Sequence, residues 1–198
     1  RQCIRSYLFP LLLLLLAARV NGFTNDDDNW IPEQYTQLYH HHTADDFTNN
    51  RFYRINDNYN PEFAGQMCGN HAVFGADHAG AQDYIAIHYT QLPSHYAFVV
   101  TLNLWYVDSW DSELIDFYYH DGTKWHHLLR RSSHHSNHGA NLCGWDKYGE
   151  SMFPYSTGVK SHNLSEVLFY QYIRTNEYVY KESGGFSDIR LYIAECYG

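Results

Sequence analysis

Three carboxylates fall within six residues of the chain, in the run Asp108-Ser109-Trp110-Asp111-Ser112-Glu113. Carboxylate oxygens so spaced in a bend suit Ca²⁺, which takes about six to eight oxygen ligands in a flexible geometry. The run lacks the turn glycine and the regular ligand alternation of an EF-hand loop. Two other interpretations stay open. One is a turn whose acids accept hydrogen bonds from backbone N–H groups, and the other is a catalytic carboxylate pair, which needs two carboxyls placed across a cleft.

The other residues of chemical interest predict no reaction. Eight of the 14 histidines cluster at His40-His41-His42, His126-His127 and His134-His135 with His138. Adjacent histidines usually point in different directions, and no Cys-x-x-Cys accompanies them, so we expect solvated loops rather than a zinc site. The chain also lacks a Gly-x-Ser-x-Gly elbow, a phosphate-binding glycine loop and a Cys/His nucleophile pair. The sequence therefore predicts a protein that is not an enzyme.

The first 22 residues have the pattern of a secretory signal. Two arginines, Arg1 and Arg5, precede an apolar run from Tyr7 to Ala18, and small residues follow near Gly22. The run is shorter than the ~20 apolar residues of a membrane span, so we expect a secreted mature chain without one. The rival interpretation keeps these residues as an apolar N-terminal strand.

The composition excludes other classes of partner and of fold. The net charge is −9 and no basic stripe is present, so nucleic acid is not expected as a partner. Hydrophobic residues make up 44% and charged residues 18%, which excludes a disordered acidic chain and a coiled coil. Asn163-Leu164-Ser165 is an acceptor for an N-linked glycan, which predicts a surface loop at Asn163.

Residues 23–62 are expected to form an extended N-terminal arm. The segment is polar and irregular, yet it carries spaced aromatic residues that a disordered tail would not need. Short stretches such as 51–55 could dock as strands. The arm could pack over its own domain, or it could add to the sheet edge of a neighbouring subunit.

Residues 63–198 predict an all-β domain. From His95 to Val107, alternate positions are apolar, and the opposite face is mixed. Further strands are expected at 83–89, 113–120, 124–129, 166–173 and 187–194, and Asp121-Gly122 predicts a hairpin with a type I′ turn. No segment has a helical period. Short antiparallel strands with polar turns favour an antiparallel β-sandwich or jelly roll.

The mature chain would hold three cysteines, because Cys3 lies in the signal. Cys68 opens the first core strand and Cys196 closes the last one, and these two ends could lie side by side. We therefore predict a disulfide between Cys68 and Cys196. Cys143 would then be unpaired or would bridge to another chain.

The order of motifs from Cys68 to Cys196 resembles secreted and cell-surface β-sandwich modules of ciliates and other protists. The matching pieces are Cys68-Gly69, Phe74-Gly75, Leu92-Pro93-Ser94-His95, the run from Leu104 to Glu113, Asp121-Gly122, Cys143-Gly144, Glu182-Ser183, and the run from Asp188 to Ile193. The chain departs from that pattern at Asn70 and at Gly184-Gly185-Phe186. The resemblance implies an extracellular β-sandwich, an acidic cluster joining Asp108, Asp111, Glu113 and Asp188, and roles in surface coats or fibres. It implies no defined reaction.

Two functions are predicted from these features. The first is a structural subunit of an extracellular glycoprotein filament or surface coat, which self-associates into a homopolymer through the arm and the sandwich faces. A contact that does not close on itself generates an open helical filament. The alternative is a secreted, lectin-like carbohydrate-binding module. Exposed aromatics such as Trp125 or Trp145 would stack on sugar rings, and the acidic turn would hold Ca²⁺.

Overall fold

The structure is a computed structural model that describes residues 35–41, 52–54, 65–134, 139–144, 148–179 and 181–195. The predicted signal at 1–22, most of the predicted arm, and Cys196 lie outside the described residues. The described part contains twelve strands and no helix. It therefore also contains no helix of the length and apolar character that a membrane crossing requires.

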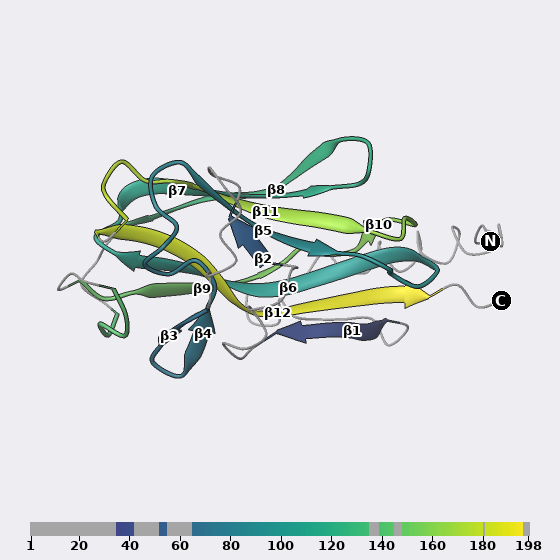
Figure 1. The fold of residues 1–198 in the computed structure, drawn as a ribbon, viewed down its shortest axis with the longest axis horizontal. Helices are drawn as coiled ribbons and strands as arrows, with labels where there is room; N and C mark the ends of the chain where they lie inside the picture. Colours follow the sequence, from purple (N-terminus) through teal and green to yellow (C-terminus); the bar gives the residue numbers. More distant parts are fainter. Residues whose placement is uncertain are drawn as a thin grey trace, which may run out of the picture.

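Two antiparallel sheets of five strands pack face to face (Figure 1). Sheet A contains β1 (Thr36–His41), β12 (Glu182–Glu195) and β6 (His95–Asp108), and the free edge of β6 takes both β9 (Ser151–Ser156) and β10 (Lys160–Ser161). Sheet B has the order β2 (Phe52–Arg54), β5 (Asp83–Tyr89), β11 (Val167–Arg174), β7 (Asp111–His120) and β8 (Trp125–His134). A hairpin of β3 (Gln66–Cys68) and β4 (His71–Val73) completes the fold. The predicted antiparallel β-sandwich is confirmed.

The core lies between the two sheets and follows the period-two pattern of their strands. In β6, five of the six predicted positions face the core, from Phe98 to Tyr106. Tyr96 is the exception, with 47% of its surface exposed. The pairing of β6 with β12 shifts between Ala97 and His95, which leaves Tyr96 outside the regular ladder. In β12, Ile189, Leu191 and Ile193 are buried as the alternation predicted.

A second, smaller core covers part of the outer face of sheet A. Trp105 points away from the main core, yet only 2% of its surface is exposed. It packs in a cluster with Cys68, Val73 and Cys143 from the β3–β4 hairpin and the 139–144 segment. Its indole N–H donates to Ser187 Oγ at 2.8 Å. The mixed outer face of β6 is therefore covered by the chain itself at this end.

The disulfide joins Cys68 to Cys143, with Cα atoms 4.7 Å apart. The predicted pairing of Cys68 with Cys196, which left Cys143 unpaired, is wrong. The prediction placed Cys68 at the start of a core strand. Instead Cys68 lies on the hairpin folded over sheet A, and the neighbouring Gly69 N–H donates to Leu142 O at 3.4 Å. The hairpin thus meets the 139–144 segment, and the disulfide closes a separation of 75 residues.

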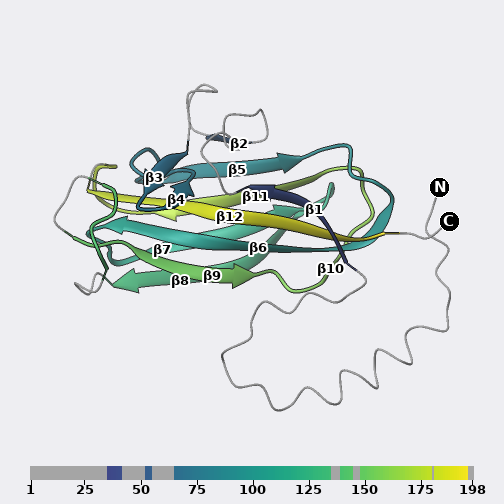
Figure 2. The ribbon, with the colours of Figure 1, turned by 90° about the horizontal axis from the view of Figure 1, so that it is seen from below.

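The described strands of the arm pair with this same chain (Figure 2). β1 pairs with β12, and β2 pairs with β5, so each extends one edge of the sandwich. Phe52 and His41 are buried, and their rings contact each other with centroids 4.9 Å apart. The described part of the arm therefore follows the interpretation in which the arm packs over its own domain.

Asp121-Gly122 does form the β7–β8 hairpin, but with a longer turn than predicted. Strand pairing stops at His120 and Trp125, which leaves a four-residue loop, 121–124. Only Gly122 has a positive φ, at 88°, so the turn is not type I′. The Asp121 carboxylate accepts hydrogen bonds from the backbone N–H groups of Thr123 and Lys124, both at 2.9 Å, and these contacts hold the loop.

Candidate functional site

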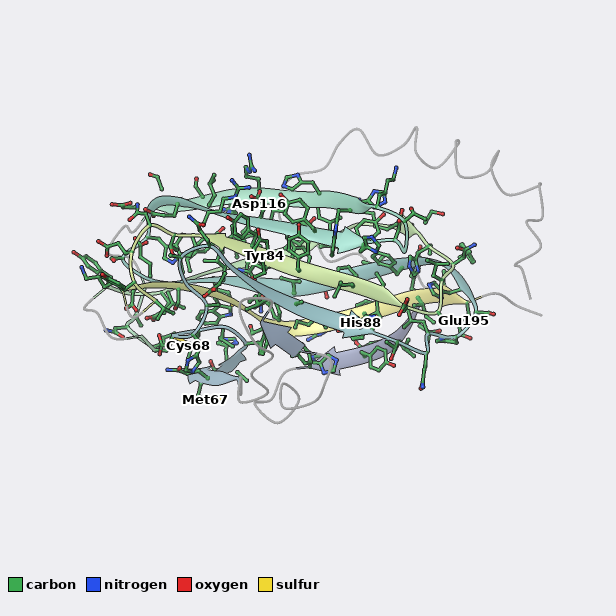
Figure 3. The ribbon with its side chains drawn as sticks, turned by 45° about the horizontal axis from the view of Figure 1, so that its top comes forward. Met67, Cys68, Tyr84, His88, Asp116 and Glu195 are labelled. Atoms are coloured by element: carbon green, nitrogen blue, oxygen red, sulfur yellow. A yellow bond between two sulfur atoms is a disulfide. The ribbon has the colours of Figure 1, made fainter. Side chains whose placement is uncertain are left out.

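Sheet B carries aromatic side chains on the face that points away from the core (Figure 3). In β11, alternate residues from Val167 to Ile173 are buried, so Tyr170 and Tyr172 point outward with Arg174. The solvent face of an antiparallel sheet is usually polar. We call Tyr84, Tyr118, Tyr170, Tyr172 and Trp125 the tyrosine face; the tyrosines are half-buried and Trp125 is 45% exposed.

The antiparallel register arranges this face in rows across four strands. From β5 through β11 and β7 to β8, the rows are Tyr84, Tyr172, Asp116 and Arg130; Ala86, Tyr170, Tyr118 and His127; and His88, Leu168, His120 and Trp125. Residues directly opposite each other on neighbouring strands are in contact distance. The rings are therefore brought together by the strand pairing alone.

The rings contact one another as a continuous layer. Tyr84 and Tyr172 stack with centroids 4.3 Å apart and planes 7° from parallel. Tyr118 stacks on Tyr170 at 4.7 Å, and Trp125 meets the edge of Tyr170 at 4.5 Å. The Arg174 guanidinium lies over the Tyr172 ring, 4.7 Å from its centroid. Each ring is thus held by a neighbour, which limits the entropy lost when a ligand binds.

A buried carboxylate anchors the polar side of the face. Asp116 has no exposed side-chain surface, although it lies on the outer side of sheet B. Arg130 donates to it through Nε at 2.7 Å and Nη2 at 3.1 Å, Arg174 Nε lies 2.7 Å from Oδ2, and His127 Nε2 lies 3.1 Å from Oδ1. Burial would raise the pKa of Asp116, but the hydrogen bonds from Arg130 and His127 and the charge of Arg174 outweigh it and lower the pKa.

The electrostatics of the face differ from those of the whole chain. Two arginines surround one carboxylate, so this part of the face is positive in a chain of net charge −9. Burial, with the charges of Tyr118 and Tyr84, raises the pKa of Tyr170 to about 12. Burial also raises the pKa of Tyr84, which shares a hydrogen bond with Tyr172. These hydroxyls therefore stay protonated at neutral pH and can both donate and accept hydrogen bonds.

The sequence predicted only part of this face. Trp125 was expected to be an exposed aromatic and lies on it, whereas Trp145 lies outside the described residues. The four tyrosines and Asp116 were not predicted as site residues. A usable signal existed, because all of them occupy outward positions of strands that the sequence predicted. His126 and His127 lie in β8 rather than in a solvated loop, and they contact Asp121 and Asp116.

The acidic residues predicted as one calcium cluster do not lie together. Asp111 and Glu113 meet, but their third partner is Glu182, with ligand atoms within 4.8 Å of one another. The buried Asp108 is not in this group, and its carboxylate lies against the backbone of Gly144.

Asp188 is also misplaced by the prediction, because it lies six residues along β12 from Glu182, about 20 Å at the usual strand rise. Its Oδ1 lies 2.7 Å from His40 Nε2 and 3.1 Å from Arg190 Nη2, on the outer face of sheet A. The predicted cluster of Asp108, Asp111, Glu113 and Asp188 is therefore wrong in two members.

The predicted glycosylation acceptor is accessible. Asn163 is exposed in the loop between β10 and β11, as the sequence predicted for a surface loop. The neighbouring Leu164 lies against Gly122 of the β7–β8 turn, which places the acceptor near the Trp125 end of sheet B. The attachment of a glycan stays a prediction.

No family model and no curated protein matches this chain. Among solved structures, it is similar to the K3 cleaved adhesin domain of Lys-gingipain from Porphyromonas gingivalis W83, with 10% identity, 79% of this chain and 99% of that chain covered, and a TM-score of 0.48. It is also similar to the C-terminal CBM6 of LamC from Zobellia galactanivorans, with 11% identity and a TM-score of 0.34; the match covers 79% of this chain and 98% of that chain. TmCBM61, solved in complex with β-1,4-galactotriose, has 11% identity and a TM-score of 0.33; the match covers 81% of this chain and 89% of that chain. These likenesses are too distant for a function to be argued from them.

Proposed function

We propose that the chain is a secreted, non-catalytic carbohydrate-binding module that binds glycan chains across the tyrosine face of sheet B. The single observation that carries this proposal is the layer of half-buried, mutually stacked rings on the outer side of the sheet. A partly exposed aromatic layer on the outer face of a sheet, where polar residues are usual, supports a binding site there.

Sugars match the chemistry of this face. One side of a pyranose ring presents C–H groups, which pack on exposed aromatic surface. Tyr84 and Tyr172 cover a face of each other and Arg174 lies over Tyr172, so the sugar would contact the outward edges of these rings and the more exposed ring of Trp125. The rim of the sugar carries hydroxyls, which need hydrogen-bond donors and acceptors. The tyrosine hydroxyls provide both, and the guanidinium groups of Arg130 and Arg174 provide donors with 50% and 40% of their side-chain surface exposed.

The extent of the face favours an oligosaccharide over a single sugar. The rows cross four strands, and neighbouring strands are about 4.8 Å apart, so the face is about 14 Å wide. The positive charge near Asp116 further favours glycans that carry carboxylate or sulfate groups. The disulfide between Cys68 and Cys143 supports the predicted secretion, because such bonds persist in oxidising compartments.

A glycan array tests this proposal. The full chain should bind a set of oligosaccharides, and Tyr172→Ala should weaken binding at least about tenfold, because Tyr172 lies between Tyr84 and Asp116. Tyr96→Ala is the matched control, since Tyr96 is 47% exposed but belongs to sheet A. Equal binding by all three proteins, or no binding by any of them, would refute the proposal.

Self-association into a filament is a second candidate function for the same face. Tyrosine, tryptophan and arginine are also the residues that dominate the centres of protein–protein interfaces. The arm gives this candidate less support, because β1 and β2 already pair with strands of the same chain. Sedimentation velocity decides between the two: concentration-dependent assembly lost in Tyr172→Ala would favour the filament, and a monomer at all concentrations would exclude it.

A further inference from the structure

Three carboxylates from separate parts of the chain meet at one end of the sandwich. Asp111 and Glu113 begin β7, and Glu182 begins β12, so both strands start at the same end (Figure 1). One oxygen from each of the three carboxylates lies within 4.8 Å of the others. Two oxygens bound to one Ca²⁺ can be at most about 5 Å apart, twice the usual bond length, so the spacing allows a shared cation.

An independent observation points to a ligand at this place. Glu182 is 99% buried, since only 1% of its surface is exposed, and its Oε2 accepts no hydrogen bond. A buried carboxylate oxygen without a hydrogen bond is unfavourable unless a counter-charge or a proton compensates it. The charges of Glu113, Glu177 and Asp111 act on Glu182, and all three are carboxylates. Negative groups therefore surround Glu182, and the adjacent Lys181 pairs with Glu177, its Nζ 3.6 Å from Glu177 Oε2.

We propose that Asp111, Glu113 and Glu182 form a Ca²⁺ site that fastens the start of β12 to the β6–β7 turn. This inference does not depend on the proposed glycan binding. The three ligands come from both sheets, so a bound ion would link sheet A to sheet B at this end. It also differs from the cluster predicted from the sequence, because Glu182 takes part and Asp108 and Asp188 do not.

The donor set selects Ca²⁺ among common cations. All three ligands are carboxylates, and neither histidine nor cysteine belongs to the group, which disfavours zinc. Mg²⁺ requires a near-ideal octahedron, whereas Ca²⁺ accepts irregular sets of oxygens completed by water. Asp111 is exposed and gives the ion a route of entry, while Glu113 is held by Asn176 Nδ2 at 2.8 Å and by the Asp111 N–H at 2.6 Å.

The thermal stability of the full chain with and without calcium tests the site. At about pH 8, a Ca²⁺ concentration near 100 times Kd should raise Tm by about 5–10 °C over the value in EDTA. Glu182→Gln should abolish this rise, and in EDTA it should melt at or above the wild-type temperature, because one of three clustered negative charges is removed. Glu195→Gln is the matched control, since Glu195 is an exposed glutamate at the other end of β12 (Figure 3) and should keep the full response.

Terbium luminescence provides a readout that does not depend on folding stability. The Trp110 indole N–H donates to Ser183 O at 2.8 Å, one residue from Glu182, so Trp110 should sensitise Tb³⁺ bound at the site. The emission should be displaced by Ca²⁺ and absent in Glu182→Gln. Extracellular modules bind Ca²⁺ with Kd of about 10⁻⁴–10⁻³ M. No change in Tm up to about 10 mM Ca²⁺, or an undiminished response in Glu182→Gln, would overturn the proposal.

Discussion

Replacing Asp116 by asparagine should lower the stability of the fold and release the two arginines that Asp116 holds beside the tyrosine face. The carboxylate is fully buried and accepts four hydrogen bonds or ion-pair contacts, from Arg130, Arg174 and His127. Asp116→Asn keeps the shape of the side chain and removes its charge. The two arginines would then face an amide that can accept from only one atom, and they would be released from fixed positions beside Tyr172.

The expected loss of folding free energy in Asp116→Asn follows from the number of contacts to Asp116 and from the exposure of its partners. A hydrogen bond to a charged group contributes about 1.5–3 kcal/mol, so the two arginines together would contribute about 3–6 kcal/mol if fully buried. Both guanidinium groups are 40–50% exposed and would regain water, which reduces the net loss to about 3 kcal/mol. For a domain of this size, that corresponds to a decrease in Tm of about 6–12 °C.

Urea unfolding and differential scanning calorimetry measure this loss. Glu166→Gln is a suitable comparison, because Glu166 forms a 3.2 Å pair with His88 on the same sheet but its side chain is 59% exposed. We expect that variant to lose less than about 1 kcal/mol. If Asp116→Asn is as stable as Glu166→Gln, and its glycan affinity is unchanged, then Asp116 does not organise the face.

Three further predictions concern the stability and modification of the domain. Cys143→Ser should cost about 4 kcal/mol in chemical unfolding, since the disulfide closes a loop of 75 residues, and a non-reducing peptide map should contain the Cys68–Cys143 cross-link. Burial, together with the charge of the neighbouring His95, lowers the pKa of His162 from 6.5 to about 4. Between these two pH values the unfolded chain therefore binds more protons than the folded chain. The free energy of unfolding should decrease as the pH decreases from about 6.5 to 4, by at most about 1.4 kcal/mol per pH unit. In His162→Phe this slope should decrease by up to one proton, and an unchanged slope would assign it to other groups. Asn163→Gln should remove the mass of one N-linked glycan from the secreted protein, and an unchanged mass would show that Asn163 is not modified.

The local pattern of the sequence was sufficient to predict six strands, β5, β6, β7, β8, β11 and β12, but not β1, β3, β4, β9 or β10. The alternation in β6 and β12 reports directly which side chains enter the core, because the period of a strand is two wherever it lies. Tyr96 escaped this rule because a register shift next to His95 depends on the partner strand. The existence of these six strands could thus be predicted from each segment alone, whereas a register shift depends on two paired strands.

The site could not be predicted because it depends on which strands are neighbours. Tyr84, Tyr118 and Tyr172 come from three strands that are far apart in the sequence and adjacent in sheet B. Glu182 joins Asp111 and Glu113 for the same reason, because its strand lies beside β6 and begins at the turn after Asp108. The cysteine pairing was misjudged because the β3–β4 hairpin folds over sheet A, a tertiary contact with no local signal.

An NMR titration tests most directly whether glycans bind on the tyrosine face. The full chain, labelled at its tyrosine rings, would be titrated with an oligosaccharide that binds on the array. We predict shifts of the ring signals of Tyr84, Tyr118, Tyr170 and Tyr172, with Tyr96 on sheet A unchanged. Saturable binding that leaves these four signals unmoved, or that moves Tyr96 instead, would contradict the claim.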